Sequence, residues 1–218
     1  MREITLVRHG QANTGARSEA DYDRLSDLGR RQARWLGEYL SDSGGYSRVI
    51  SGELNRQRQT AEALNRDGRP HEIDPRLNEL DYFGLSEFLA RKRGVPFPEN
   101  AAEFAAHVVQ VLDVWRNEPL AEGLERYDDF RARILGAARA AAGGADERVV
   151  LVTSTGVIAT LIAIALGLDT VAKARLFLRV MNTSVHRFEL VGDEIHLLQF
   201  GAVPHLDRPG RRASQTYF

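Results

Sequence analysis

Two short apolar runs, residues 4–7 and 149–152, each pass directly into a small polar loop. Both runs are rich in aliphatic and β-branched residues, which is typical of a strand buried in a sheet. The first loop carries Arg8, His9 and Gly10, and the second leads into an apolar helical stretch. In open α/β sheets, ligands bind beyond the carboxyl ends of the strands. The repeated pattern therefore predicts an α/β fold whose chemistry lies at these two loops.

The rest of the chain alternates between strand-like and helix-like patterns. We expect further strands near residues 48–51, 69–74, 182–190 and 195–200, and helices near residues 26–40, 54–65, 127–142 and 157–166. Such alternation favours βαβ units and a mainly parallel sheet. We expect one domain over residues 1–218, with a helical insertion at about residues 86–123, an edge hairpin, and a coil tail after Gly201.

The composition argues against several classes of protein. The 218 residues carry a formal net charge of −1, so we expect neither nucleic acid nor a membrane as a partner. Cysteine is absent, which removes thiol catalysis and zinc–thiolate sites and fits a cytoplasmic location. The apolar residues 156–168 are too few to cross a membrane, and the early first strand leaves no room for a signal peptide. The six histidines lack His-x-x-x-His spacing, so we expect no metal and no other cofactor.

Four side chains are candidates for chemistry on an anionic substrate. Arg8 offers a planar fork for phosphate oxygens, and His9 is a nucleophile or proton carrier near neutral pH. Arg56 is expected in the first turn of a helix, where free N–H groups also favour an anion. Glu79 has apolar neighbours, which suits a carboxyl group to act as a proton donor. The plainer alternatives are a strand-end pair without function, a solvated helix face for Arg56, and a surface carboxylate for Glu79.

The loop after the second run holds two hydroxyl groups, those of Ser154 and Thr155. Together with nearby N–H groups, they could hold phosphate oxygens. Ser and Thr are also good helix caps. We expect both roles here, because a cap residue at this edge of the sheet also faces the cleft.

Together, these residues resemble the histidine phosphatase superfamily, also called the phosphoglycerate mutase-like family. The resemblance rests on five motifs in the family's order: Arg8-His9-Gly10, Leu25-Ser26-x-x-Gly29-x-x-Gln32-Ala33, Arg56-x-x-Gln59-Thr60-Ala61, Leu77-Asn78-Glu79 and residues 153–158. It covers most of the chain and is weakest at about residues 87–126. The opening, residues 8–36, is most similar to a bacterial branch of the family. The fold that the resemblance implies is a three-layer α/β/α sandwich with a mainly parallel sheet.

The resemblance also implies roles for the candidate residues. His9 would attack phosphorus and form a phosphohistidine, which splits the transfer into two steps. Arg8 and Arg56 would hold the phosphoryl oxygens and offset their charge in the transition state. Glu79 would protonate the leaving oxygen and then activate water. No metal would be needed, because the arginines supply the positive charge.

One position departs from the family's pattern. The family usually has a second histidine in the loop after the central strand, and this chain has Ser154 there. A serine hydroxyl can bind a phosphoryl oxygen but cannot carry the charge of an imidazolium. A charged hydrogen bond is worth about 1.5–3 kcal/mol and a neutral one about 1 kcal/mol. A rate loss of about ten-fold is therefore expected.

Three functions remain open from the sequence. The first is a phosphomonoesterase that acts on a small phosphorylated metabolite. The second is a weakened relative that binds a phosphorylated ligand without turnover, and the third is a phosphoglycerate mutase, which the short middle of the chain disfavours. We expect residues 13–23 and 87–123 to choose the substrate. The edge hairpin and the apolar residues 176–180 leave a dimer open.

Overall fold

The centre of the molecule is a six-stranded sheet in the order β3-β2-β4-β1-β5-β6. The computed structural model describes residues 2–13, 18–144 and 148–217. The strands are β1 (Arg2–Arg8), β2 (Arg48–Ser51), β3 (His71–Ile73), β4 (Val149–Thr153), β5 (Val185–Val191) and β6 (Glu194–Ala202). β1 to β4 run parallel to one another, and β5 pairs antiparallel with β1 and forms an antiparallel hairpin with β6 at one edge. The expected mainly parallel sheet is therefore confirmed.

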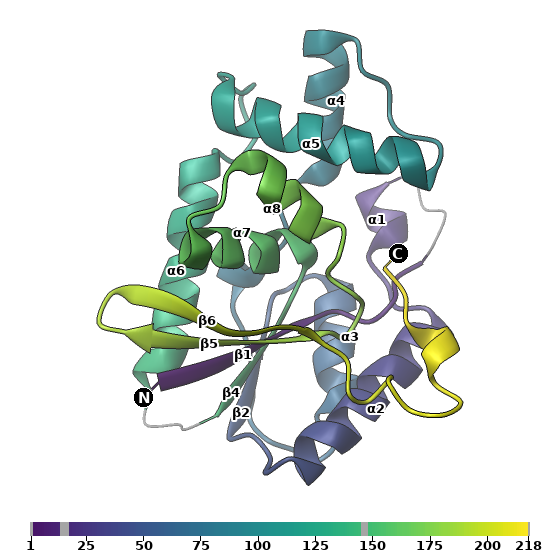
Figure 1. Ribbon diagram of the computed structural model, residues 1–218, viewed down its shortest axis with the longest axis vertical. Helices are drawn as coiled ribbons and strands as arrows, with labels where there is room; N and C mark the ends of the chain where they lie inside the picture. Colours follow the sequence, from purple (N-terminus) through teal and green to yellow (C-terminus); the bar gives the residue numbers. More distant parts are fainter. Residues whose placement is uncertain (1, 14–17, 145–147, 218) are drawn as a thin grey trace.

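Helices cover both faces of this sheet, so the fold is the expected three-layer α/β/α sandwich (Figure 1). One face is covered by α2 (Asp27–Asp42) and α3 (Asn55–Leu64), and the other by α6 (Tyr127–Gly143), α7 (Thr155–Leu166) and α8 (Thr170–Phe177). α1 (Glu19–Tyr22), α4 (Tyr82–Arg93) and α5 (Ala101–Asn117) complete the set. α4 and α5 form the upper part of the view in Figure 1, beyond the layers of the sandwich.

The alternation of β1 shows how the sequence builds this sandwich. Ile4 and Leu6 pack into the apolar cluster under α6 and α7, whereas Val7 packs into the cluster under α2 and α3. Successive side chains of a strand point to opposite faces, so β1 contributes to both layers of the core. Arg8 continues the series of Ile4 and Leu6, and its side chain therefore leaves the sheet on the α7 side.

The register of the sheet brings the ends of the two apolar runs together. Arg8 pairs with Thr153 across β1 and β4, and Ser51 of β2 pairs with Val152 of β4. The loops that follow these three strands consequently leave the sheet at one edge. The His9 backbone N–H also donates to the Thr153 carbonyl at 2.9 Å, which fixes the first loop against the second.

Three local expectations differ from the structure. The tail after Gly201 was expected to be coil, but β6 continues to Ala202 and a short 3-10 helix spans Arg212–Ser214. The helices α1 and α8 did not stand out in the sequence because each is short, at four and eight residues. The middle segment begins its first helix at Tyr82, where Asp81 accepts a hydrogen bond from the Gly84 N–H and caps the helix.

Within the described residues, no helix combines the length and the apolar character that a membrane span requires.

Candidate active site

A cavity of about 410 Å³ lies at the carboxyl ends of β1 and β4. Five of the six residues that the sequence nominated line it: Arg8, His9, Arg56, Glu79 and Thr155. They come from four separate parts of the chain, and the parallel strands bring them together. We call Arg8, His9, Arg56 and Glu79 the polar cradle.

His9 is oriented by its own loop. Its Nδ1 lies 2.8 Å from the Gly10 carbonyl oxygen, and because a carbonyl only accepts, Nδ1 carries the proton and donates it. The other ring nitrogen, Nε2, is then the one with a free lone pair. Burial, with the positive charges of Arg56 and Arg8 nearby, lowers the pKa of His9 well below its ordinary value of 6.5. His9 is therefore neutral at pH 7, which is the state a nucleophile needs.

The Arg8 side chain is held in place by two backbone carbonyls. Its Nη1 donates to the Val180 carbonyl and, at 2.8 Å, to the Tyr217 carbonyl. Its Nε is buried and has no acceptor within the described part of the chain. Burial lowers the pKa of Arg8, but an arginine stays protonated in proteins. The site thus holds a fixed cation whose buried Nε–H is engaged by none of the described acceptors.

Arg56 is clamped by the residue pair Tyr22 and Asp23. Asp23 accepts from Nη1 of Arg56 at 3.1 Å, and its two carboxylate oxygens also accept from the backbone N–H groups of Asn55 and Arg56. Asp23 therefore caps α3, whose own N-cap residue forms no side-chain cap. The guanidinium carbon of Arg56 lies 4.9 Å from the centre of the Tyr22 ring. The prediction that Arg56 lies in the first helical turn is confirmed, and the alternative of a solvated helix face is excluded because Arg56 is 1% exposed.

Glu79 reaches the cavity through contacts with the second loop. Its Oε2 accepts from the Gly156 N–H at 2.9 Å, in the first turn of α7, and its Oε1 accepts from the Leu80 N–H at 2.9 Å. A carboxylate at a helix N-terminus is favoured by the free N–H groups and the helix dipole. A Cβ at Gly156 would overlap Glu79 Oε1, so only glycine allows this approach.

Arg133 of α6 holds the backbone on either side of this carboxylate. Its Nη1 donates to the carbonyls of Arg76 and Asn78 at 2.7 and 2.8 Å. Its Nη2 lies 3.5 Å from the carbonyl of Glu79, and Glu125 completes an ion pair with the guanidinium. The loop that carries Glu79 is thus tied to α6, a contact that no local sequence pattern reveals.

Ser154 occupies a different place from its neighbour Thr155. Its side chain is fully buried and does not line the cavity. Its Oγ accepts a hydrogen bond from Gln57 Nε2 at 2.8 Å, and it forms no side-chain cap on α7 although it is the N-cap residue. The sequence expectation that Ser154 caps the helix is therefore wrong, because Glu79 fills the helix end. Ser154 faces α3, and the hydroxyl-bearing residue of this loop that faces the cavity is Thr155.

The remaining motif residues support the loops. Gln32 accepts from the Gln11 N–H, Gln59 accepts from the Leu25 N–H, and Thr60 accepts from the Gly10 N–H, at 2.9–3.0 Å. A Cβ at Gly10 would overlap the Gly29 carbonyl of α2, so the glycine is needed for this packing. Through these bonds, the motif residues hold the backbone of the loops around the cavity.

The C-terminal tail belongs to the site. Gln32 Nε2 donates to the Ser214 carbonyl at 2.7 Å, and the Asn182 N–H donates to the Thr216 carbonyl at 2.8 Å. Tyr217 accepts from Arg8 and lines the cavity. The tail that was expected to be coil therefore packs beside the polar cradle. This role could not be predicted from the sequence, because the tail's contacts are with residues far away in the chain.

Four rings form a second part of the cavity lining: Tyr82, Phe83, Phe97 and Phe104. We call them the aromatic wall. Phe83 and Phe97 stack with an interplanar angle of 8° and ring centres 5.6 Å apart. Tyr82 meets the other three rings with centres 5.6–6.1 Å away. The wall belongs to α4, α5 and their connection. Phe97 and Phe104 lie within residues 87–123, which were expected to choose the substrate, whereas Tyr82 and Phe83 lie before that segment. Of the other expected segment, residues 13–23, residues 14–17 lie outside the described residues.

A buried lysine, Lys173, is close enough to Glu79 for their charges to interact. Lys173 of α8 donates to Thr160 Oγ1 at 3.3 Å, and its Nζ lies 4.4 Å from the centre of the Tyr127 ring. Burial, together with the positive charge of Arg116, lowers the pKa of Lys173 to about 7, although the negative charge of Glu79 opposes the shift. Among the described residues, no group of three or more His, Asp or Glu side chains is arranged to hold a metal ion.

Comparison with known proteins gives a consistent result. The model of the histidine phosphatase superfamily (branch 1) matches residues 4–202. Glucosyl-3-phosphoglycerate phosphatase of Mycolicibacterium vanbaalenii is 36% identical over 183 residues, which are 77% of this chain and 76% of that protein. A probable phosphoglycerate mutase of Erwinia tasmaniensis is 30% identical over 194 residues, or 87% and 85% of the two chains. The structure of mycobacterial glucosyl-3-phosphoglycerate phosphatase with VO3 has a TM-score of 0.67 and 26% identity, and covers 93% of this chain and 100% of that one.

Proposed function

This chain belongs to branch 1 of the histidine phosphatase superfamily, and on that basis we propose that it hydrolyses phosphate monoesters of small metabolites through a phosphohistidine at His9. The observation that carries the proposal is the state of His9. Its pKa is depressed, its Nδ1 proton is engaged by the Gly10 carbonyl, and His9 lines a cavity that Arg8 and Arg56 also line. This arrangement prepares Nε2 to attack phosphorus.

In the first step, His9 Nε2 forms a bond to phosphorus as the bond to the leaving oxygen breaks. Glu79 enters this step in its protonated form and gives that proton to the leaving oxygen, so the alcohol departs and Glu79 is left as a carboxylate. Arg8 and Arg56 bind the equatorial oxygens of the phosphoryl group and offset the charge that they carry in the transition state. The unused Nε–H of Arg8 and the hydroxyl of Thr155 supply further donors.

In the second step, Glu79 takes a proton from water, and the water oxygen attacks phosphorus. The bond from phosphorus to Nε2 breaks, which releases inorganic phosphate and returns neutral His9. The same carboxyl group therefore serves as acid and then as base. The two arginines supply the positive charge that this scheme requires.

Ser154 does not weaken this scheme in the way that the sequence suggested. Its hydroxyl is paired with Gln57 outside the cavity lining, so we assign it a supporting role and assign phosphate contact to Thr155. From the sequence, we expected an about ten-fold loss of rate because serine would bind phosphate in place of an imidazolium. In this scheme Ser154 does not contact the phosphoryl group, so we no longer expect that loss.

The test is hydrolysis of phenyl phosphate in the presence of EDTA, for wild type and His9→Ala. The proposal predicts turnover by wild type and a loss of at least about 10⁴-fold in kcat for the variant, since a nucleophile is removed. Phosphate binding without turnover by wild type would favour a binding protein instead. Interconversion of 2- and 3-phosphoglycerate faster than their hydrolysis would favour a mutase.

A further inference from the structure

We propose that the alcohol part of the substrate is a flat apolar group, most simply an aromatic ring, and that it binds against the aromatic wall. This inference rests on the proposed phosphatase function and names its substrate class. It follows from the position of the wall, from its chemistry and from the charges at its rim.

The position of the wall follows from the role of Glu79. A group that protonates the leaving oxygen must lie on the alcohol side of the phosphorus atom. α4 begins at Tyr82, three residues after Glu79, and Tyr82 and Phe83 both line the same cavity as His9. The wall therefore begins where the alcohol part of the substrate has to lie.

The chemistry of the wall is that of ring faces rather than hydrogen-bonding groups. The Tyr82 hydroxyl lies 2.8 Å from His107 Nδ1, so it is already paired and the ring is what Tyr82 offers. Phe97 is 43% exposed although it stacks on Phe83. Aromatic rings prefer offset-stacked or edge-to-face partners, which a substrate ring would supply at Phe97. Phe177 and Leu178 add apolar surface to the same cavity.

The charges at the rim oppose a second anionic group. Glu99 lines the cavity beside Phe97 and is exposed. Among the described residues of the lining, the cations are Arg8 and Arg56, and the phosphoryl group engages both. A carboxylate on the alcohol part would therefore lie near the negative charge of Glu99, with both cationic residues of the lining already bound to the phosphoryl group.

The test compares three phosphate esters of primary alcohols, so that leaving-group chemistry is similar: 2-phenylethyl phosphate, glycerol 1-phosphate and 3-phosphoglycerate. We expect kcat/KM for the phenylethyl ester to exceed the other two by about ten-fold. Phe97→Ala should lower kcat/KM for the phenylethyl ester by about ten-fold and change the other two by less than about two-fold. Because Phe97 is exposed, its removal should leave the fold intact.

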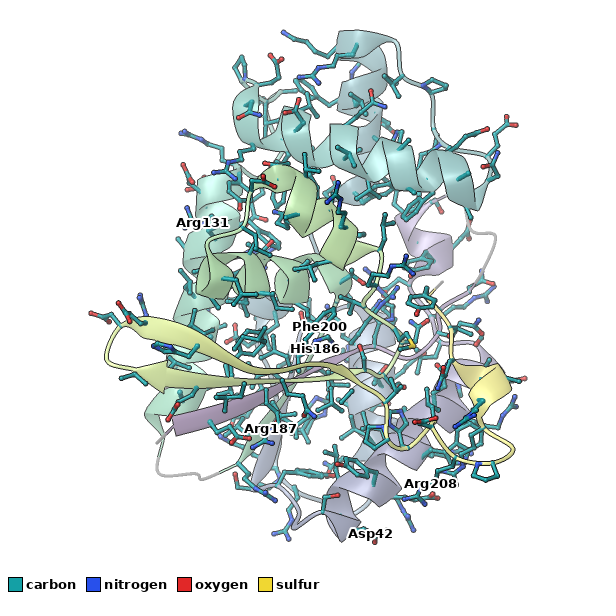
Figure 2. The ribbon with its side chains drawn as sticks, viewed as in Figure 1. Asp42, Arg131, His186, Arg187, Phe200 and Arg208 are labelled. Atoms are coloured by element: carbon teal, nitrogen blue, oxygen red, sulfur yellow. The ribbon has the colours of Figure 1, made fainter. Side chains whose placement is uncertain are left out.

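Phe200→Ala is the matched control. Phe200 is 37% exposed on β6, beside His186 on the edge hairpin and outside the cavity lining (Figure 2). It should leave all three values unchanged. Equal values for the three esters, a preference for 3-phosphoglycerate, or no effect of Phe97→Ala would each overturn the proposed substrate class while leaving phosphatase activity established.

A binding measurement separates this inference from the proposed function. Calorimetry with 2-phenylethylphosphonate and ethylphosphonate, which cannot be hydrolysed at the carbon–phosphorus bond, should show about ten-fold tighter binding of the phenyl compound. Phe97→Ala should abolish that difference. Equal binding of the two compounds by wild type would overturn the inference, whereas absence of hydrolysis with selective binding would overturn only the proposed turnover.

Discussion

The polar cradle and the aromatic wall share one cavity but are built in different ways. Each side chain of the cradle is fixed by hydrogen bonds, as when Asp23 clamps Arg56 or Gly156 holds Glu79. The rings of the wall are placed largely by contact with one another, and Phe97 remains partly exposed. Chemistry requires placement within a fraction of an ångström, whereas ring contacts tolerate small shifts. The cradle should therefore decide whether the reaction occurs, and the wall which alcohol is accepted.

The sharpest way to break the cradle is Gly156→Ala. The added Cβ would overlap Glu79 Oε1 and a methyl group of Leu80, so the carboxylate must move. A displacement of about 1 Å can cost about 100-fold, and we expect at least that loss in kcat/KM with 2-phenylethyl phosphate. Gly143→Ala is the control, because a Cβ there meets nothing within 4 Å. Equal activity of the two variants would show that the placement of Glu79 is not critical.

Asp23→Asn weakens the clamp on Arg56 without changing its size. The ion pair is lost, and the Arg56 guanidinium is left with a neutral amide oxygen as its acceptor; hydrogen bonds to charged groups are worth about 1.5–3 kcal/mol. We expect kcat/KM to fall by about ten-fold or more for all three esters alike, because the phosphoryl group is common to them. Asp21→Asn, two residues earlier on the exposed face of the same segment, should have no effect. A fall confined to one ester would assign Asp23 to the alcohol instead.

Arg133→Met tests the backbone support of Glu79. The variant keeps the apolar stem but loses the donors to the carbonyls of Arg76 and Asn78. We expect kcat to fall by about ten-fold with little change in KM, since the acid is misplaced while phosphate contacts remain. Arg131→Met on the same helix removes an ion pair with Asp128 and a contact with the Tyr127 ring, both away from the loop of Glu79, and serves as the control. A rise in KM at constant kcat would contradict a positioning role.

Tyr82→Phe probes the wall, and its expected effect on activity is the smallest. The ring stays and only the hydroxyl is lost, so kcat/KM for 2-phenylethyl phosphate should change by less than about two-fold. The buried Nδ1 of His107 loses its partner, so the free energy of unfolding should fall by about 1 kcal/mol in urea titration. A large loss of activity at unchanged stability would mean that the hydroxyl, rather than the ring, contacts the substrate.

Features that depend on local sequence could be predicted, whereas features that depend on contacts between distant residues could not. The strands and the first-turn position of Arg56 follow local patterns: apolar runs, alternation and short polar loops. From those patterns, five of the six proposed site residues were placed at strand ends or helix starts that the structure brings into one cavity. Residues whose role depends on distant partners left no such signal.

Asp23, Arg133 and Tyr217 show why the rest was hidden. Asp23 lies 33 residues from Arg56, Arg133 lies 55 residues from Asn78, and Tyr217 lies 209 residues from Arg8. Ser154 illustrates the opposite error. Its position in the loop suggested that it binds the substrate. Instead, the Ser154 hydroxyl accepts a hydrogen bond from Gln57 of α3, and this contact follows from the packing of α3 against β4.

The most direct test of the account is to trap the intermediate. Wild type is mixed with 2-phenylethyl phosphate, quenched in alkali within milliseconds, and digested for mass spectrometry of the peptide that contains His9. We predict a phosphoryl group on His9 in wild type and none in His9→Ala. Turnover of the ester by wild type with no phosphoryl group on His9, or with one on another residue, would contradict the central claim.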